Sequence, residues 1–145
     1  MPTVQEILSA KGSKVVTVSP GATVMEAVDK MNRNRIGALV VMDGDRVAGI
    51  FSERDVLQRV IGVSKDPREM FVAEVMTGDV ICCDPDDDVE EVGAIMLEKR
   101  VRHVPVCTDD GGLVGLVSIG DVNAYHVSQQ QAQISFLSDY IYGRA

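Results

Sequence analysis

The hydrophobic positions of this chain follow two periods, and each period predicts one type of element. Short runs of β-branched residues bounded by turn residues, such as residues 15–18, are typical of strands. A second kind of segment spaces its apolar side chains as i, i+3, i+4 and i+7, which predicts an amphipathic helix with one face against a sheet. In the first such helix these side chains are Val24, Ala27, Val28 and Met31.

The same reasoning predicts the other elements. Thr3 and Glu6 form the capping-box pattern that begins a helix, and Gly12 is a stop signal. The segment 43–45 contains Asp-Gly, the signal of a hairpin turn. The elements expected are a helix at 4–11, strands at 15–18, 36–42, 46–51 and 80–83, helices at 24–32 and around 89–96, a helix after Ser52 that buries Val56, Leu57, Val60 and Ile61, and a long last helix from about 119 to 142.

This order of elements occurs twice, because two halves of the chain match each other. Residues 4–9 match residues 72–77 at an offset of 68, and Arg35-Ile36 matches Arg100-Val101 at an offset of 65. Self-similarity of this kind indicates two copies of one structural unit. The division predicted is a first repeat at 1–62, a polar linker at 63–71, a second repeat at 72–127 and a helical tail at 128–145.

The best-matched frame is a strand-to-helix junction. Gly49-Ile50-Phe51-Ser52-Glu53-Arg54-Asp55 and Gly115-Leu116-Val117-Ser118-Ile119-Gly120-Asp121 share Gly, two apolar residues, Ser and Asp at the same positions. One interpretation is purely structural: Ser caps the helix and Asp bonds back to the backbone, at about 0.5–2 kcal/mol. The other interpretation is a nucleotide-binding site, since Gly in a strand marks a place where a ligand or another backbone comes close, and a helix N-terminus favours an anion.

Together these features resemble the CBS domain, the cystathionine-β-synthase domain, and the tandem resembles a CBS pair, or Bateman module. The resemblance covers nearly the whole chain, and Arg102-His103-Val104-Pro105-Val106 is the family's typical middle strand. It implies an α+β fold of two β-α-β-β-α repeats about a pseudo-twofold axis, with a short N-terminal helix and a long C-terminal helix. It also implies two clefts between the repeats and adenosine ligands: AMP, ADP or ATP, or in some members S-adenosylmethionine or NAD.

Carried over to this chain, the resemblance assigns ligand contacts in both repeats. Asp55 and Asp121 are expected to hold the ribose, and Ser52 and Ser118 to contact ribose or phosphate. Arg102 and His103 are expected near the phosphates. Backbone contacts to adenine are expected near Thr17, Val18, Ile81 and Cys82, and Gly49 and Gly115 are expected to leave room for the ligand.

The repeats differ at one position that matters for an anionic ligand. Where the second repeat has Arg102-His103, the first has Gly37-Ala38, which offers only backbone. A guanidinium binds phosphate bidentately, so the cleft that receives Arg102 and His103 is expected to be the tighter one. The sequence leaves open whether Asp55 or Asp121 belongs to that cleft. A solvated charge is the structural alternative for Arg102, and a satisfied strand histidine is the alternative for His103.

Composition excludes several other classes of function. The chain has 145 residues, a formal charge of −8, no Trp and 4% aromatic residues, which argues against nucleic-acid binding. No apolar run reaches the ~20 residues of a membrane helix, and three cysteines form no disulfide framework, so a cytoplasmic protein is expected. A zinc site at Cys82, Cys83, His103 and Cys107 lacks the Cys-x-x-Cys spacing. A calcium loop from Asp84 fails because its sixth position is Val89 rather than Gly.

These observations favour a regulatory binding module rather than an enzyme. We expect a stand-alone CBS pair that senses adenine nucleotides without a tightly bound cofactor and signals to an unknown partner protein. The alternative is a structural dimerisation module whose Ser and Asp residues only cap helices. In the last helix Val127, Ile134 and Ile141 recur every seven residues. This stripe is covered either by its own module or by a second copy in a homodimer.

Overall fold

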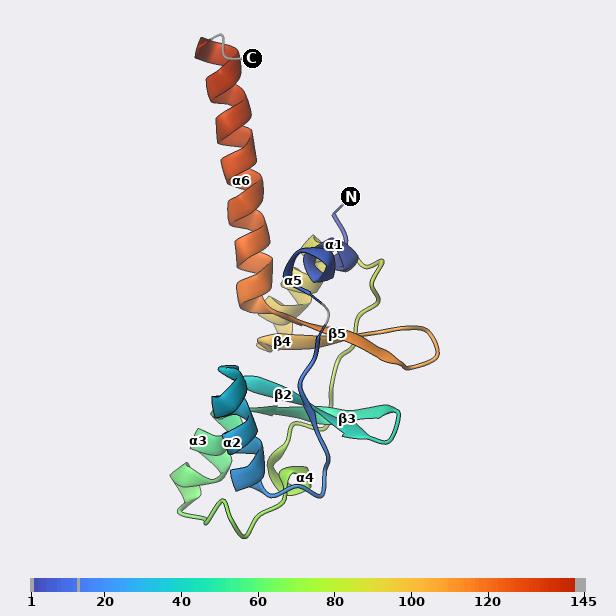
Figure 1. Cartoon of the computed structure of the whole chain (residues 1–145), viewed down its shortest axis with the longest axis vertical. Helices are drawn as coiled ribbons and strands as arrows, with labels where there is room; N and C mark the ends of the chain where they lie inside the picture. Colours follow the sequence, from blue (N-terminus) through green and yellow to red (C-terminus); the bar gives the residue numbers. More distant parts are fainter. Residues whose placement is uncertain (1, 13, 143–145) are drawn as a thin grey trace.

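The computed structural model describes residues 2–12 and 14–142, except for the side chain of Tyr142. Its two small sheets lie one above the other in Figure 1, with helices on the outer side of each and one long helix projecting from the body. The first half supplies α1 (Val4–Lys11), β1 (Thr17–Val18), α2 (Val24–Asn34), β2 (Ala38–Asp43), β3 (Arg46–Ser52), α3 (Glu53–Arg59) and the short 3-10 helix η1 (Ile61–Val63). The second half supplies α4 (Val72–Val75), α5 (Val89–Lys99), β4 (His103–Cys107), β5 (Leu113–Ser118) and α6 (Ile119–Tyr142). The α+β fold class is confirmed.

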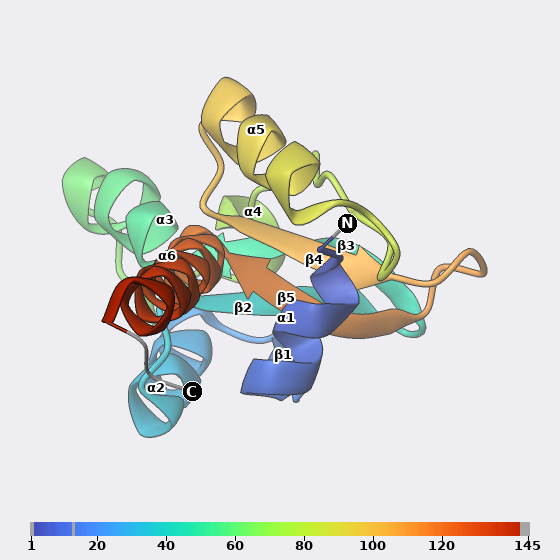
Figure 2. The same cartoon turned by 90° about the horizontal axis from the view of Figure 1, so that it is seen from above.

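A lead-in helix precedes the strands of each repeat, α1 in the first and α4 in the second, and each of these two helices packs into the core of the other repeat. Helix α1 packs into the core of the second repeat, where Val4, Ile7 and Leu8 are buried with side chains of α5, β4 and β5. Helix α4 packs into the core of the first repeat through Val72 and Val75. Backbone hydrogen bonds hold both exchanges, and from above Figure 2 shows α1 over β5 of the second sheet. Each hydrophobic core is therefore completed by a segment that precedes the other repeat.

The first sheet has the order β1-β2-β3, with β1 parallel to β2 and β2 antiparallel to β3. Gly44 lies in the hairpin turn with a φ of 62°, a conformation that favours glycine. The apolar stripe of α2 covers this sheet through Val24, Ala27 and Met31, which are buried. The hairpin and the amphipathic helix predicted from the sequence are both present.

The second sheet lacks the strand predicted at residues 80–83. Only Cys83 pairs with β4, through a single parallel bridge to Val106. In the first repeat the Val40 N–H donates to the Val16 carbonyl, but the position equivalent to Val40 is Pro105, which has no N–H to donate. The hydrogen-bond ladder therefore stops after one bridge, and the sheet keeps two strands, β4 and β5.

The helix after Ser52 differs from the prediction in what it buries. It ends at Arg59, and of the four predicted core residues only Val60 is fully buried. Leu57 and Ile61 are 64% and 57% exposed. The reason is the length of α3. Its seven residues make only about two helical turns, and the chain then continues through η1, so the helix does not carry Leu57 and Ile61 into the core.

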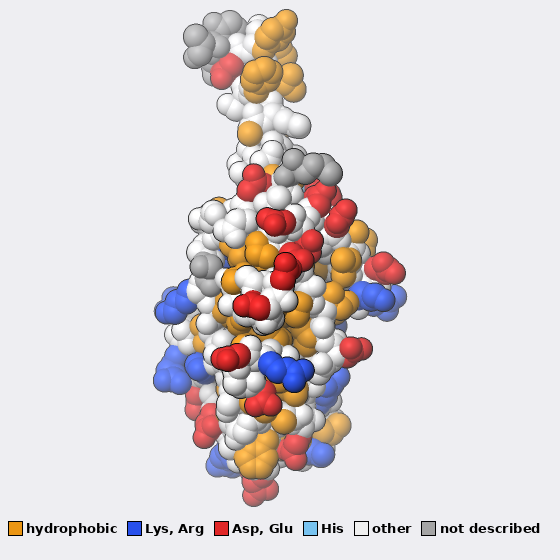
Figure 3. Space-filling model, turned by 90° about the vertical axis from the view of Figure 1, so that its right-hand side faces the viewer, with side chains coloured by type: hydrophobic (Ala, Val, Ile, Leu, Met, Phe, Trp, Pro, Cys, Tyr) orange, Lys and Arg blue, Asp and Glu red, His pale blue; other side chains and the backbone are white. Residues whose placement is uncertain are grey.

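Helix α6 continues well beyond the body of the molecule. Its 24 residues span about 36 Å at 1.5 Å per residue, and only its first turns touch α1, α5 and β5. Figure 3 shows hydrophobic side chains gathered at the projecting end. The apolar residues exposed along this helix are Val127, Ile134, Phe136, Leu137, Tyr140 and Ile141. Within the described residues, no helix is both long and apolar enough to cross a membrane.

Candidate functional site

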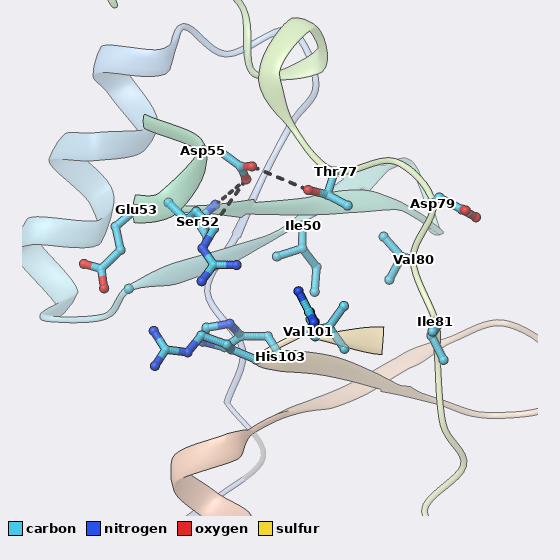
Figure 4. A pocket seen from close by; sticks show the side chains of 14 residues that line it. Ile50, Ser52, Glu53, Asp55, Thr77, Asp79, Val80, Ile81, Val101 and His103 are labelled. Atoms are coloured by element: carbon cyan, nitrogen blue, oxygen red, sulfur yellow. Dashed lines mark hydrogen bonds between the residues drawn. The ribbon is translucent and has the colours of Figure 1, made fainter. Parts of the chain in front are cut away.

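A cavity of about 170 Å³ opens between the two repeats, beside the start of α3. Figure 4 shows it bounded by the end of β3 and the start of α3 on one side, and by the segment before β4 on the other. A third wall comes from the extended chain after α4. The lining residues are Gly37, Ile50, Ser52, Glu53, Arg54, Asp55, Thr77, Asp79, Val80, Ile81, Arg100, Val101, Arg102 and His103.

Asp55 is the buried carboxylate of this cavity, with 5% of the residue exposed. The Ser52 N–H donates to its Oδ2 at 2.9 Å, and the Ser52 hydroxyl does so at 3.3 Å, which forms the capping box of α3. The Thr77 hydroxyl, on the segment after α4, donates to Oδ1 at 3.5 Å (Figure 4). Since a carboxylate offers about four acceptor positions, these bonds leave Asp55 capacity for further donors.

The middle of the cavity is apolar and its edge is charged. Ile50 and Val101 lie in the centre of Figure 4, with Val80 and Ile81 along the extended chain. Two acidic side chains, Glu53 and Asp79, stand at the edge among basic ones. The basic residues are Arg54, Arg100, Arg102 and His103. A flat apolar group fits the middle, and an anionic group fits the basic part of the edge.

Two of the basic residues owe their position to a strained turn. Arg100 follows α5 with a φ of 56°, in the left-handed region that non-glycine residues seldom adopt. Arg35, its equivalent in the first repeat, has a φ of 55°. This turn sends the chain back towards the cavity, so that Arg102 and His103 reach it at the start of β4. The sequence did not decide which Asp shares a cleft with Arg102 and His103. In the structure both residues line the same cavity as Asp55.

His103 is half-buried at the point where both repeats meet. Burial lowers its pKa, Arg102 and Lys11 lower it further, and the carboxylates of Asp121 and Glu53 act in the opposite direction. The net pKa lies below the ordinary 6.5, so His103 is neutral at pH 7. A phosphate placed beside it would favour the protonated imidazolium.

The second junction has the same bond from the serine N–H to the carboxylate, but its serine hydroxyl accepts a hydrogen bond, and its neighbour differs. The Ser118 N–H donates to Asp121 Oδ2 at 2.8 Å, and the Asp121 N–H donates to Ser118 Oγ at 3.0 Å. The Lys11 ammonium, at the end of α1, lies 2.6 Å from the same Oδ2. Neither Ser118 nor Asp121 lines the cavity at Asp55.

The two glycines of the repeated frame are explained by packing. A Cβ on Gly49 would lie 2.6 Å from the Thr77 carbonyl oxygen, and one on Gly115 would lie 2.6 Å from Leu8 Cδ2. Each glycine thus admits the lead-in segment that crosses from the other repeat. Neither glycine lines the cavity.

The remaining predicted contacts lie elsewhere. Thr17 and Val18 pair with β2, and the Lys30 ammonium donates to the Thr17 carbonyl. Cys82 is exposed and lies with Cys83 and Cys107 along a different, open groove. Burial raises the pKa of Cys83 to about 12 and that of Cys107 to about 11, so both thiols stay protonated at neutral pH.

Sequence reasoning missed several lining residues of the cavity. Thr77 and Asp79 belong to the segment that crosses between repeats, and their position depends on that exchange. Ile50 lies inside the repeated frame and could have been found there, because its neighbours Gly49 and Ser52 were singled out. Arg54 carried no signal, since exposed arginines are common on any surface, and Arg100 was noted only because it matches Arg35 in the first repeat.

The comparisons with known proteins agree with this architecture. The sequence matches the family profile described as CBS domain at residues 4–62 and again at 72–127. A CBS-domain-containing protein of Agrobacterium tumefaciens is 37% identical, with a TM-score of 0.81 over 86% of this chain and 99% of its own. A CBS domain protein of Pyrobaculum aerophilum complexed with AMP is 27% identical, with a TM-score of 0.75 over 83% of this chain and 89% of its own.

Relatives of known sequence differ in length. A mitochondrial CBS domain-containing protein of Arabidopsis thaliana is 31% identical over 97% of this chain and 72% of its own length. The chain spans 56% of the length of a Methanopyrus kandleri relative. With two matched repeats that fill most of its length, the chain belongs to the CBS-domain family.

Proposed function

We propose that this protein is a regulatory module that binds AMP, ADP or ATP in the cavity at Asp55. The observation that carries the proposal is the combination of one buried carboxylate, an apolar middle and a basic edge in a single cavity. The AMP complex of the Pyrobaculum aerophilum relative supports the choice of adenine nucleotides. The role proposed for the module is that of a sensor and not of an enzyme.

Each part of the nucleotide has a matching part of the cavity. The ribose hydroxyls donate to Asp55, whose bonds to Ser52 and Thr77 hold it in place. The adenine lies between Ile50 and Val101, with edge contacts to the extended chain at Ile81. The phosphates lie towards Arg102 and His103, where charge-assisted hydrogen bonds are shorter and stronger than neutral ones. Because the cavity is smaller than the ~300–1,000 Å³ of common ligand sites, the phosphates extend beyond it.

Calorimetric titration with AMP, ADP and ATP tests this function. We expect binding to the unmodified protein, and a loss of at least about tenfold in affinity for Asp55→Asn, which weakens the acceptor of the ribose hydroxyls. Asp29→Asn, the same exchange on the exposed side of α2, is the matched control and leaves the affinity unchanged. Thermal unfolding shows whether the Asp55 variant is folded.

A second variant tests the phosphate end independently of buried residues. Arg54 is exposed at the edge of the cavity, so Arg54→Gln keeps the fold and is expected to weaken ATP binding more than adenosine binding. Binding of S-adenosylmethionine or NAD in place of the nucleotides would redirect the assignment to those ligands. No heat with any adenosine compound would favour the structural alternative, in which Asp55 and Asp121 only cap their own helices.

Signalling requires that the nucleotide bind one conformation better than another, since equal affinity shifts no population. We propose that an unknown partner protein in the cytoplasm responds to this change of conformation. The three cysteines of the chain are free thiols, as expected in a reducing compartment. The Arabidopsis relative is described as mitochondrial.

We further propose that α6 pairs with α6 of a second copy in a homodimer. Its exposed Val127, Ile134 and Ile141 recur every seven residues, the spacing that keeps an apolar seam facing a partner helix. Between Val122 and Ile141 the only Asp, Glu, Lys or Arg is Asp139, so two copies meet with little like-charge repulsion. Sedimentation of two variants measures the oligomeric state. Ile134→Lys, in the apolar seam, should give monomers, and Ser135→Lys, on another face of the helix, is the control and should not.

A further inference from the structure

The second junction repeats the sequence frame of the first, yet its carboxylate already has a cation. Lys11 Nζ lies 2.6 Å from Asp121 Oδ2 and donates to the Leu116 carbonyl at 2.8 Å. At the first junction the crossing segment brings Asp55 only the neutral hydroxyl of Thr77, and the cation beside Asp55 is Arg59 of its own helix, whose Nε lies 4.0 Å from Oδ1. The two junctions thus differ in the charge that the exchanged segment brings to them.

Helix length explains how Lys11 reaches Asp121. Helix α1 has eight residues and ends at Lys11, whereas its counterpart α4 has four and the chain is extended from Met76 onwards. Leu8 anchors α1 against Gly115, in the space where a side chain at that position would stand. One further turn beyond Leu8 places Lys11 over the start of α6. The ammonium is therefore positioned by a buried helix and not by a free side chain alone.

Lys11 supplies what a nucleotide would otherwise supply at this junction. Its N–H groups donate to Asp121, as ribose hydroxyls would, and its charge compensates the carboxylate. Burial on its own raises the pKa of Asp121, but the hydrogen bonds from Lys11 and Ser118 outweigh it, and the pKa lies below the ordinary value. Gly37, which stands where the other repeat has Arg102, lines the Asp55 cavity and brings no charged side chain to the Asp121 junction.

We propose that Lys11 acts as a built-in occupant of the Asp121 junction, so that each chain binds a single nucleotide, at Asp55. This inference rests on the proposed function and adds to it the number of sites and the residue that sets that number. Lys11 excludes the ribose by holding its acceptor. Removing the ammonium opens a second, weaker site that uses Asp121.

Calorimetric titration with AMP tests this by counting sites in four proteins. The unmodified chain and Lys11→Arg, which keeps a cation on Asp121, are expected to bind one AMP per chain. Lys11→Met, which keeps the aliphatic stem, is expected to bind a second AMP. Adding Asp121→Asn to Lys11→Met should return the number to one. Lys14→Met, at an exposed lysine three residues further on, is the matched control and should bind one.

The outcomes separate this inference from the proposed function. One site in both the unmodified protein and a folded Lys11→Met variant, or two sites in the unmodified protein, would overturn the role of Lys11 and leave nucleotide binding intact. No AMP binding by any of the proteins would end both. Thermal unfolding of Lys11→Met establishes that its fold is kept before the sites are counted.

Discussion

The two strand-to-helix junctions show how one sequence frame acquires two different environments. Ser52 with Asp55 and Ser118 with Asp121 share the bond from the serine N–H to the carboxylate, at 2.9 and 2.8 Å. The junctions differ in the segments that cross to them from the other repeat. One segment brings the Thr77 hydroxyl to Asp55, and the other brings the Lys11 ammonium to Asp121. Local chemistry therefore explains the cap, and the tertiary exchange decides which junction stays open to a ligand.

The largest expected effect comes from the glycines that admit the crossing segments. In Gly49→Ala the new Cβ meets a backbone carbonyl at 2.6 Å, which must move, so we expect a loss of about 3 kcal/mol in the free energy of unfolding. In Gly115→Ala it meets the flexible end of Leu8, and about 1 kcal/mol is expected.

Urea unfolding midpoints measure this difference. Gly21→Ala, whose Cβ would meet no atom within 4 Å, is the matched control and should lose nothing. Equal losses at Gly49 and Gly115 would show that backbone and side-chain obstacles cost the same, and would contradict the packing explanation.

An intermediate effect is expected from the arginine that distinguishes the two repeats. Arg102 is exposed and lines the cavity at Asp55, so Arg102→Gln removes a charged phosphate contact without disturbing a core. We expect about a tenfold loss in affinity for ATP, or about 1.4 kcal/mol, and a smaller loss for adenosine.

Fluorescence or calorimetric titrations with both ligands check the Arg102 prediction. Arg33→Gln, on α2 and away from the cavity lining, controls for the change in net charge. If both arginine variants weakened ATP binding alike, the effect would be one of long-range charge and not of a contact.

The smallest expected effect concerns the ion pair at the second junction. The pKa of Asp121 is lowered in the folded chain, so its contribution to stability is present above the unfolded pKa of about 3.8 and is lost as the pH falls below it. Lys11 is 37% exposed and Asp121 22%, so we expect only about 0.5–1 kcal/mol from the pair.

Unfolding of Lys11→Met and of the unmodified chain at pH 7 and at pH 2.5 measures that contribution. The gap between the two proteins should be present at pH 7 and narrow at the acid pH, which lies below the unfolded pKa of the Asp121 carboxyl. A gap that persisted unchanged in acid would assign the loss to packing of the lysine stem instead of to the ion pair.

Much of the fold was accessible from the sequence because it depends on local patterns. The stripe of Val24, Ala27 and Met31, the capping boxes and the Asp-Gly turn each involve neighbours within a few residues, and each is present in the structure. The strand expected at residues 80–83 failed because its ladder depends on Pro105, more than twenty residues away, having no N–H. Burial of Leu57 and Ile61 failed because it depends on where α3 ends.

The candidate site divides in the same way. By itself the sequence determined the two repeats, the Gly, Ser and Asp of each junction, and the difference between Arg102-His103 and Gly37-Ala38. Only the tertiary structure decided that Asp55 shares a cavity with Arg102 and His103, and that Lys11 pairs with Asp121. The physical reason is that caps and stripes are settled between residues close in the chain, whereas the cavity depends on lead-in segments that pack into the opposite repeat.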